Sequence, residues 1–196
     1  GSTYPVSEDE QVVLPNPGET FYLTKEIDNL TGTAGDDVFR VVEAEQMTQF
    51  DTVDGGAGND TLEVYTGDDL KGTFTNIENL VVAGADVSTS GYDLSFFSKS
   101  FTLKVEKDAT VSHVTNQTLV MDDAGNKTLT ATMDDDQTSV KLVNEGSTGA
   151  TFKAEGTKLD SMDLTTNTST TLQDGADSTV KNVAITALAD ATIALT

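Results

Sequence analysis

The sequence predicts an all-β fold, a parallel β-solenoid or β-roll-like structure with glycine-rich turns. Short runs of alternating apolar and polar residues, bounded by Gly, Asn and Asp, occur along the whole chain. In the second half these runs recur mostly about 10–12 residues apart, or at twice that spacing. A β-sandwich would give the same rhythm, but it usually has a larger aromatic core. Phe152 is the one aromatic residue after Phe101, so small Thr and Ala side chains favour the narrow solenoid core.

Changes in composition divide the chain into three predicted segments. Residues 1–25 contain all three prolines and read as an extended arm, with Gly1 and Ser2 resembling a cloning remnant. Residues 26–85 form a β segment rich in Gly and Asp, and residues 86–196 form a Thr/Ala-rich series of strand repeats. The longest apolar runs are far too short to span a bilayer, so no membrane insertion is expected.

The charge narrows the classes of partner. Thirty-three acidic residues against 11 basic ones give a formal net charge of -22. Such a surface repels nucleic-acid phosphates and anionic lipid, which argues against both as partners. The absence of cysteine excludes disulfides and thiolate metal sites. A compact chain with this charge therefore needs another stabilising element, and bound cations are the first candidate.

One internal repeat carries the metal chemistry. Residues 28–39 align without a gap over residues 51–62, an offset of 23 residues (51 − 28 = 23), and the two copies share five of their twelve positions. Within each copy the two aspartates stand nine apart (37 − 28 = 9 and 60 − 51 = 9). Residues 55–63 match every fixed position of the nonapeptide G-G-x-G-x-D-x-U-x, whereas the first copy has Thr33 at the second glycine.

Glycines in such a turn let the chain bend tightly with its carbonyl groups facing inward, and the aspartate that follows adds an anionic oxygen. Calcium binds about six to eight oxygen ligands, which stacked turns can supply together. The predicted calcium-site residues are Asp28, Gly32, Gly35, Asp37, Asp51, Gly55, Gly56, Gly58 and Asp60.

This pattern resembles the RTX, or haemolysin-type, calcium-binding repeats of proteins exported by type I secretion. Over residues 17–85 it is still more similar to bacterial surface-layer (S-layer) proteins, because residues 21–24 precede the repeat and residues 75–82 follow it as in that group. The resemblance implies Ca²⁺, a β-roll or solenoid, secretion to the cell surface and lattice assembly. RTX β-rolls place 18 residues in each coil, whereas the offset here is 23, so one or two ions are expected rather than a long ladder.

The sequence thus predicts a structural segment of a self-assembling, calcium-stabilised surface-layer protein. A module of a large RTX adhesin and a calcium-binding accessory domain of a secreted hydrolase remain the alternatives. The expected partners are copies of the same protein, with a cell-surface polysaccharide as a second candidate. No catalytic residues are predicted, since His113 is the single histidine and no G-x-S-x-G nucleophile motif occurs.

Overall fold

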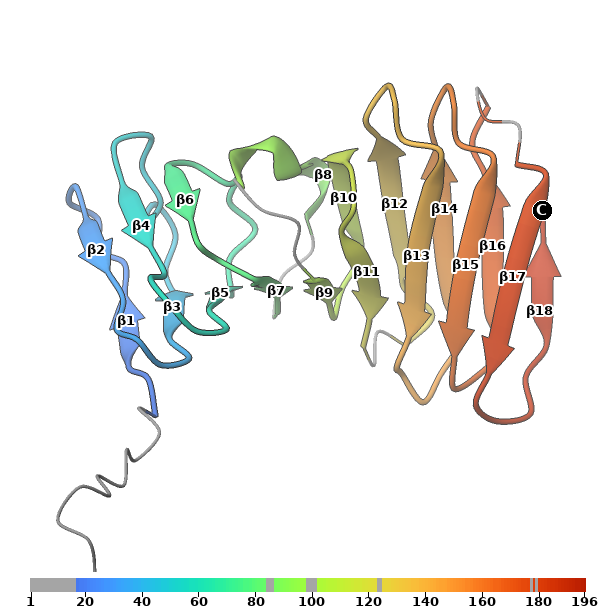
Figure 1. The fold of residues 1–196 in the computed structure, drawn as a ribbon, viewed down its shortest axis with the longest axis horizontal. Coiled ribbons are helices and arrows are strands. Elements are labelled where there is room, and N and C mark those ends of the chain that lie inside the picture. The colour runs from blue at the N-terminus through green and yellow to red at the C-terminus, as the bar shows by residue number, and fades with distance from the viewer. Residues whose placement is uncertain (1–16, 84–86, 98–101, 123–124, 177, 179) are drawn as a thin grey trace, which may run out of the picture.

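The chain winds into a flattened solenoid in which every strand pairing is parallel. The structure is a computed structural model that describes residues 17–83, 87–97, 102–122, 125–176, 178 and 180–196. Odd-numbered and even-numbered strands form two opposed layers, so that one strand from each layer makes up a coil (Figure 1). The prediction of a solenoid is confirmed. The sandwich alternative is wrong, because each strand pairs with a strand of the next coil and none of the described strands pairs as a hairpin.

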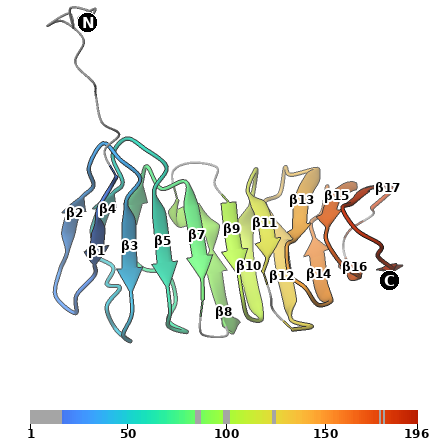
Figure 2. The same ribbon diagram turned by 90° about the horizontal axis from the view of Figure 1, so that it is seen from below.

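The odd-numbered strands form one nine-stranded sheet, called sheet A, in which they lie side by side in chain order (Figure 2). Its strands are β1 (Thr20–Tyr22), β3 (Val38–Val41), β5 (Thr61–Val64), β7 (Asn79–Val82), β9 (Thr102–Val105), β11 (Thr118–Met121), β13 (Ser139–Asn144), β15 (Ser161–Thr166) and β17 (Asn182–Ala187).

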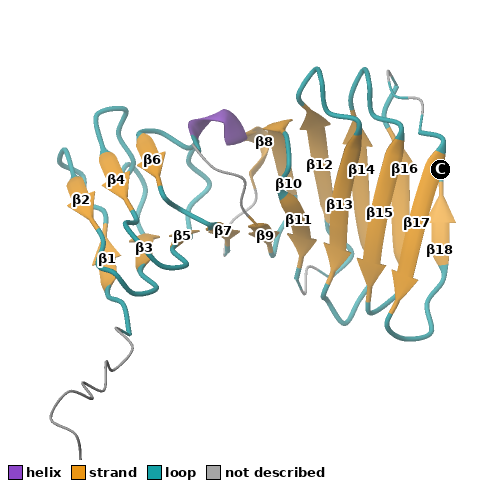
Figure 3. Cartoon of the chain, viewed as in Figure 1, coloured by secondary structure: helices purple, strands orange, loops and turns teal. Residues whose placement is uncertain are grey.

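The even-numbered strands form two sheets that together face sheet A. Sheet B contains β2 (Asn29–Thr31), β4 (Thr52–Asp54) and β6 (Thr73–Thr75). Sheet C contains β8 (Val87–Asp93), β10 (Ala109–Val114), β12 (Thr128–Met133), β14 (Ala150–Glu155), β16 (Thr170–Asp174) and β18 (Ile193–Leu195). A short 3₁₀ turn, η1 (Leu94–Phe96), follows β8 and is drawn in purple in Figure 3. No helix among the described residues is long and apolar enough to cross a membrane.

Coil length alternates near the N-terminus. Phe21 pairs with Phe39 after 18 residues (39 − 21 = 18), and Phe39 pairs with Leu62 after 23 (62 − 39 = 23). The next two steps, to Leu80 and then Leu103, again measure 18 and 23 (80 − 62 and 103 − 80). The offset of the sequence repeat is therefore the length of the longer coil, and the 18-residue coil typical of RTX β-rolls also occurs in this chain.

Strand alternation produces the core. In β3 and β5 every second side chain points inward, and the inward residues Phe39, Leu62, Leu80 and Leu103 are fully buried. They stack at one register position, with the Phe21 and Phe39 rings 5.0 Å apart. Stacking of like apolar side chains removes their surfaces from water, at about 25 cal/mol per Å². This buried column holds the coils in register.

The predicted segments join without interruption in sheet A. Strand β1 lies within the predicted arm, whose residues 1–16 are outside the described residues. Strand β7 pairs with β9, so sheet A passes through the predicted division at residue 85. The opposite layer changes there from sheet B to sheet C, which are linked by a bridge between Phe74 and Phe97 whose rings stack 5.5 Å apart. The division of the chain into three segments therefore remains a prediction that rests on composition.

Candidate metal site

The predicted calcium residues lie along the two opposite edges of the flattened coil. Asp28 and Asp51 end the loops that lead into β2 and β4, whereas Asp37 and Asp60 end the turns that lead into β3 and β5. The nine-residue spacing within each copy is thus one crossing from edge to edge. All four aspartates are buried, with exposed fractions of 8% for Asp28, 1% for Asp51 and 0% for Asp37 and Asp60.

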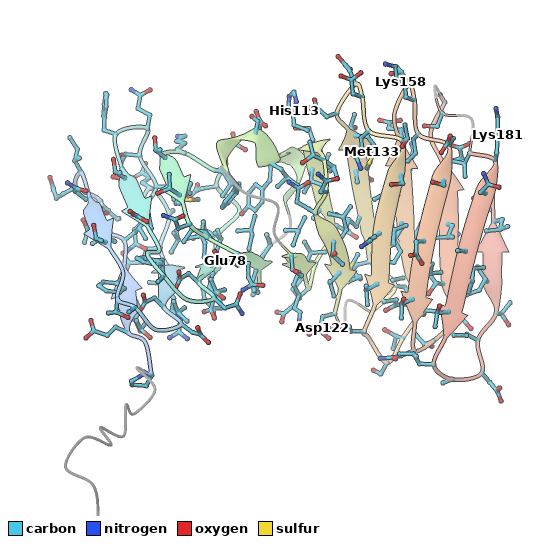
Figure 4. The ribbon with its side chains drawn as sticks, in the orientation of Figure 1. Glu78, His113, Asp122, Met133, Lys158 and Lys181 are labelled. Carbon is cyan, nitrogen blue, oxygen red and sulfur yellow. The ribbon has the colours of Figure 1, made fainter. Side chains whose placement is uncertain are left out.

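At the turn edge, backbone amides of one coil bind carboxylates of the next. The Glu19 amide donates to Asp37 Oδ1 at 2.7 Å, and the Asp37 amide donates to Asp60 Oδ1 at 2.8 Å. The Asp60 amide in turn donates to Glu78 Oε2 at 2.7 Å. Asp37, Asp60 and Glu78 therefore form a carboxylate ladder, which ends at the start of β7 in Figure 4. The ladder provides acceptors for the backbone amides of Glu19, Asp37 and Asp60, which lie just before their strands and outside the strand pairings.

Glu78 was not predicted as a site residue. The turn between β6 and β7, which contains Glu78, lacks the glycines that mark the two repeat copies. A local pattern in the sequence does mark Glu78. Asp37, Asp60 and Glu78 each stand two residues before an apolar side chain of the following strand that points into the core. The 18-residue step from Asp60 to Glu78 places this third acid at the same edge.

At the loop edge, the Asp28 amide donates to Asp51 Oδ1 at 2.9 Å. The aspartates at this edge are also held by threonines of their own coil. Thr24 donates its amide to Asp28 Oδ2 at 2.7 Å and its hydroxyl to Asp28 Oδ1 at 2.9 Å. Thr48 makes the same pair of hydrogen bonds to Asp51, at 2.7 and 2.8 Å. These threonines were also missed by sequence reasoning.

A third threonine makes the same arrangement at the turn edge. Thr33 donates its amide to Asp37 Oδ2 at 2.6 Å and its hydroxyl to Asp37 Oδ1 at 2.8 Å. Burial raises the pKa of the Asp37 carboxyl, but the hydrogen bonds from Glu19 and Thr33 outweigh it and leave the pKa below its usual value. Thr33 stands where the nonapeptide has its second glycine, so the departure from the motif supplies the Asp37 carboxylate with donors.

The predicted glycines permit the close stacking of the turns. A Cβ on Gly32 would lie 2.2 Å from the Gly55 carbonyl oxygen, and one on Gly58 would lie 2.3 Å from the Gly35 carbonyl oxygen. Gly56 has a φ of +83°, which L side chains rarely adopt, and its Cβ would meet the Thr33 carbonyl oxygen at 2.7 Å. The backbone carbonyl groups of Thr33 and Gly35 therefore lie directly against the second turn.

Asp60 differs from the other three aspartates. Its Oδ1 accepts the Asp37 amide, but its Oδ2 is buried and has no hydrogen-bond partner. Burial raises the pKa of the Asp60 carboxyl, and the negative charges of Glu78, Asp37 and Asp36 raise it further against the opposing Asp37 hydrogen bond. A buried, unpaired carboxylate oxygen among like charges is costly. It favours either a proton or a bound cation.

Calcium fits this position if most of its ligands are neutral oxygens. Among the described residues no group of three or more His, Cys, Asp and Glu side chains lies close enough to hold a metal. Asp60 Oδ2 lies 2.7 Å from the position of a Cβ on Gly55, within the stacked turns. Calcium accepts backbone carbonyls and water beside a carboxylate. Asp60 and the carbonyl groups of the two glycine turns are thus the residues that would hold an ion.

Comparison with known proteins identifies the repeat. The family described as the RTX calcium-binding nonapeptide repeat (4 copies) matches residues 24–40 and 48–70. These ranges contain the four aspartates and the two glycine turns. No curated protein and no solved structure matches the chain. The chain therefore carries RTX repeats in its first coils, and the predicted cofactor, Ca²⁺, is supported by this match.

Proposed function

We propose that this RTX-bearing solenoid is a structural segment of a secreted bacterial surface-layer protein, which calcium stabilises and which assembles with copies of itself. The main observation that supports this proposal is sheet A. Its nine parallel strands form one continuous rod, and the RTX turns lie in the first coils only. A β-roll whose role is calcium-driven folding of an enzyme would carry the repeats along most of its length. RTX proteins are typically exported by type I secretion, and an extracellular location is part of the proposal.

Assembly is favoured by the strand edges and opposed by the charge. Among the described strands, β1 and β2 in the first coil and β17 and β18 in the last each pair on one side only, which leaves backbone donors and acceptors that can pair with another solenoid or with further coils of the same protein. The large apolar side chains Ile185, Leu188 and Leu195, in or beside β17 and β18, are exposed in the last described coil. Two copies with a net charge of -22 repel each other, so divalent cations are needed to bring them together.

A calcium series with the purified chain tests the proposal. Light scattering should show growth of the particles as calcium rises beyond the amount that saturates folding, and negative-stain microscopy should then show ordered sheets or filaments. A chain that stays monomeric at every calcium concentration contradicts the lattice role. Arrays that form equally well in chelator contradict the calcium requirement.

The adhesin alternative is favoured by one observation. A groove of about 660 Å³ lies beside the loops that lead into β2, β4 and β6. The strand register places Ile27, Phe50 and Lys71 one above another there, because each stands two residues before the first paired residue of its strand. Ile27 and Phe50 are 68% and 64% exposed. An exposed aromatic ring beside charged side chains can contact a sugar ring. Binding of a bacterial surface polysaccharide by the monomeric chain, with loss on Phe50→Ala, would favour this alternative.

The accessory-domain alternative and a catalytic role have less support, and we expect no turnover from this chain. His113 is the one histidine, and its Nδ1 lies 3.3 Å from Asp134 Oδ1 with both side chains about half exposed. An exposed pair of this kind is typical of a solvated surface contact. Hydrolysis of ester, peptide or glycoside substrates that is lost on His113→Ala would contradict this expectation.

A further inference from the structure

We infer that threonine side chains replace the cation at three of the four repeat aspartates, so that calcium binding at the RTX turns depends on Asp60 and not on Asp28, Asp37 or Asp51. The inference rests on the proposed calcium stabilisation and deepens it. The observation that carries it is a difference in hydrogen bonding between equivalent carboxylates. Three accept an amide and a hydroxyl from one threonine, and the fourth has an oxygen with no partner.

A threonine that donates twice acts on both carboxylate oxygens. The amide binds Oδ2 and the hydroxyl binds Oδ1 at Asp28, Asp37 and Asp51 alike. A cation bound by the carboxylate in bidentate fashion would contact the same two oxygens. Asp37 and Asp51 each also accept a backbone amide from another coil, so hydrogen bonds compensate their charge without a metal. We call each such pair a threonine cap: Thr24 with Asp28, Thr33 with Asp37, and Thr48 with Asp51.

Asp60 has no threonine cap because Gly56 occupies the capping position. Thr33 precedes Asp37 by four residues, and Gly56 precedes Asp60 by the same number (37 − 33 and 60 − 56). Glycine has no hydroxyl, and the Gly56 amide donates instead to Asp54 Oδ1 at 3.0 Å. One position of the nonapeptide therefore decides between two states. Threonine at this position gives an aspartate with a threonine cap, which needs no metal. Glycine there leaves a buried anionic oxygen that calcium can bind.

Calcium titration calorimetry and thermal melting of the whole chain, in chelator and in millimolar calcium, test this inference with three variants. Asp60→Asn should lose the calcium-binding heat and the calcium-dependent rise in Tm. Asp51→Asn should lower Tm by the same amount in chelator and in calcium, and leave the binding heat unchanged. Thr33→Gly should lower Tm in chelator, yet bind more calcium per chain and show a larger calcium-dependent rise in Tm.

The outcomes separate this inference from the proposed function. Loss of the calcium response in Asp51→Asn, with Asp60→Asn unaffected, overturns the assignment. So does a Thr33→Gly variant whose calcium stoichiometry equals that of the unmodified chain. If Asp60→Asn fails to fold, by circular dichroism, the gain of binding in Thr33→Gly still decides the case. An unmodified chain that binds no calcium would instead contradict the proposed calcium stabilisation.

Discussion

The backbone amide of Asp28 lies 2.9 Å from Oδ1 of Asp51, a residue 23 positions later in the chain. The same carboxylate accepts the amide and hydroxyl of Thr48, so one buried side chain receives three donors from two coils. This arrangement ties the loop edge of one coil to that of the next. It links sequence positions that no local motif connects.

Replacing Asp51 by alanine should destabilise the chain by about 3 kcal/mol, because each buried donor left without an acceptor costs about 1–3 kcal/mol and water can satisfy some of them. Urea unfolding in chelator, followed by circular dichroism, measures the change. Asp69→Ala is the matched control, since Asp69 is exposed in the next loop, and it should leave stability within about 0.5 kcal/mol. Equal effects of the two substitutions would contradict a structural role for the Asp51 hydrogen bonds.

Gly55→Ala should destabilise the chain through a steric clash. A Cβ at this position would lie 2.1 Å from the Asn76 carbonyl oxygen of the next coil and 2.7 Å from Asp60 Oδ2. Separating the stacked turns to admit it should cost about 1–3 kcal/mol, as in overpacked cores. Gly125→Asn is the control, because nothing lies within 4 Å of a Cβ there and asparagine tolerates its φ of +58°. A Gly55→Ala chain that melts at the unmodified Tm would show that the turns can separate freely.

The effect of Asp37→Asn should depend on pH in chelator. The folded-state pKa of Asp37 is lower than the ordinary value of 3.8, so its ionised form contributes stability that is present above that value. This contribution is lost as the pH falls through the folded-state pKa. The stability difference between the unmodified chain and Asp37→Asn should therefore be largest near neutral pH and shrink as the pH falls below about 4. A difference that is constant across this range contradicts the assignment.

Removal of calcium should lower the Tm by several degrees. At a hundredfold excess over its dissociation constant, one bound ion stabilises the native state by about 2.7 kcal/mol. Scanning calorimetry of the chain in millimolar calcium and in chelator measures the effect. Magnesium at the same concentration is the control and should restore little of the loss, because it requires near-octahedral geometry and gives up its water reluctantly. Identical melting curves in chelator and calcium would contradict the prediction.

The sequence predicted the fold class and the position of the repeat because both depend on local patterns. Alternation in residues such as Val38–Val41 produces strands, and paired glycines produce turns, whatever the rest of the chain does. The coil lengths could not be predicted in the same way. The step of 18 from Asp60 to Glu78 is shorter than the step of 23 from Asp37 to Asp60 because both connections are shorter. The loop before β6 spans residues 65–72, against 42–51 before β4, and the turn before β7 spans residues 76–78, against 55–60 before β5. Loop length is only weakly constrained by composition.

The hydrogen bonds at the site could not be predicted from local patterns either, because they join residues that only the folded chain brings together. Thr24, Thr33 and Thr48 are ordinary residues of a threonine-rich chain until the backbone brings each one against its aspartate. Asp60 was predicted as a ligand on the nonapeptide motif, yet its difference from Asp37 depends on whether residue 33 or 56 carries a hydroxyl. Side-chain satisfaction is a property of the folded register and is not readable from spacing alone.

The stacking of coils in register also determines how the chain would respond to force. Neighbouring strands lie about 4.8 Å apart, so each coil adds little to the length of the rod. The same coil stores 18 or 23 residues, which reach about 60–80 Å when drawn straight. Tension applied along the rod would peel coils from an end one at a time, while the remaining coils keep their neighbours. A rod built this way can therefore lengthen severalfold under load, because each released coil adds far more length than it occupied in the stack.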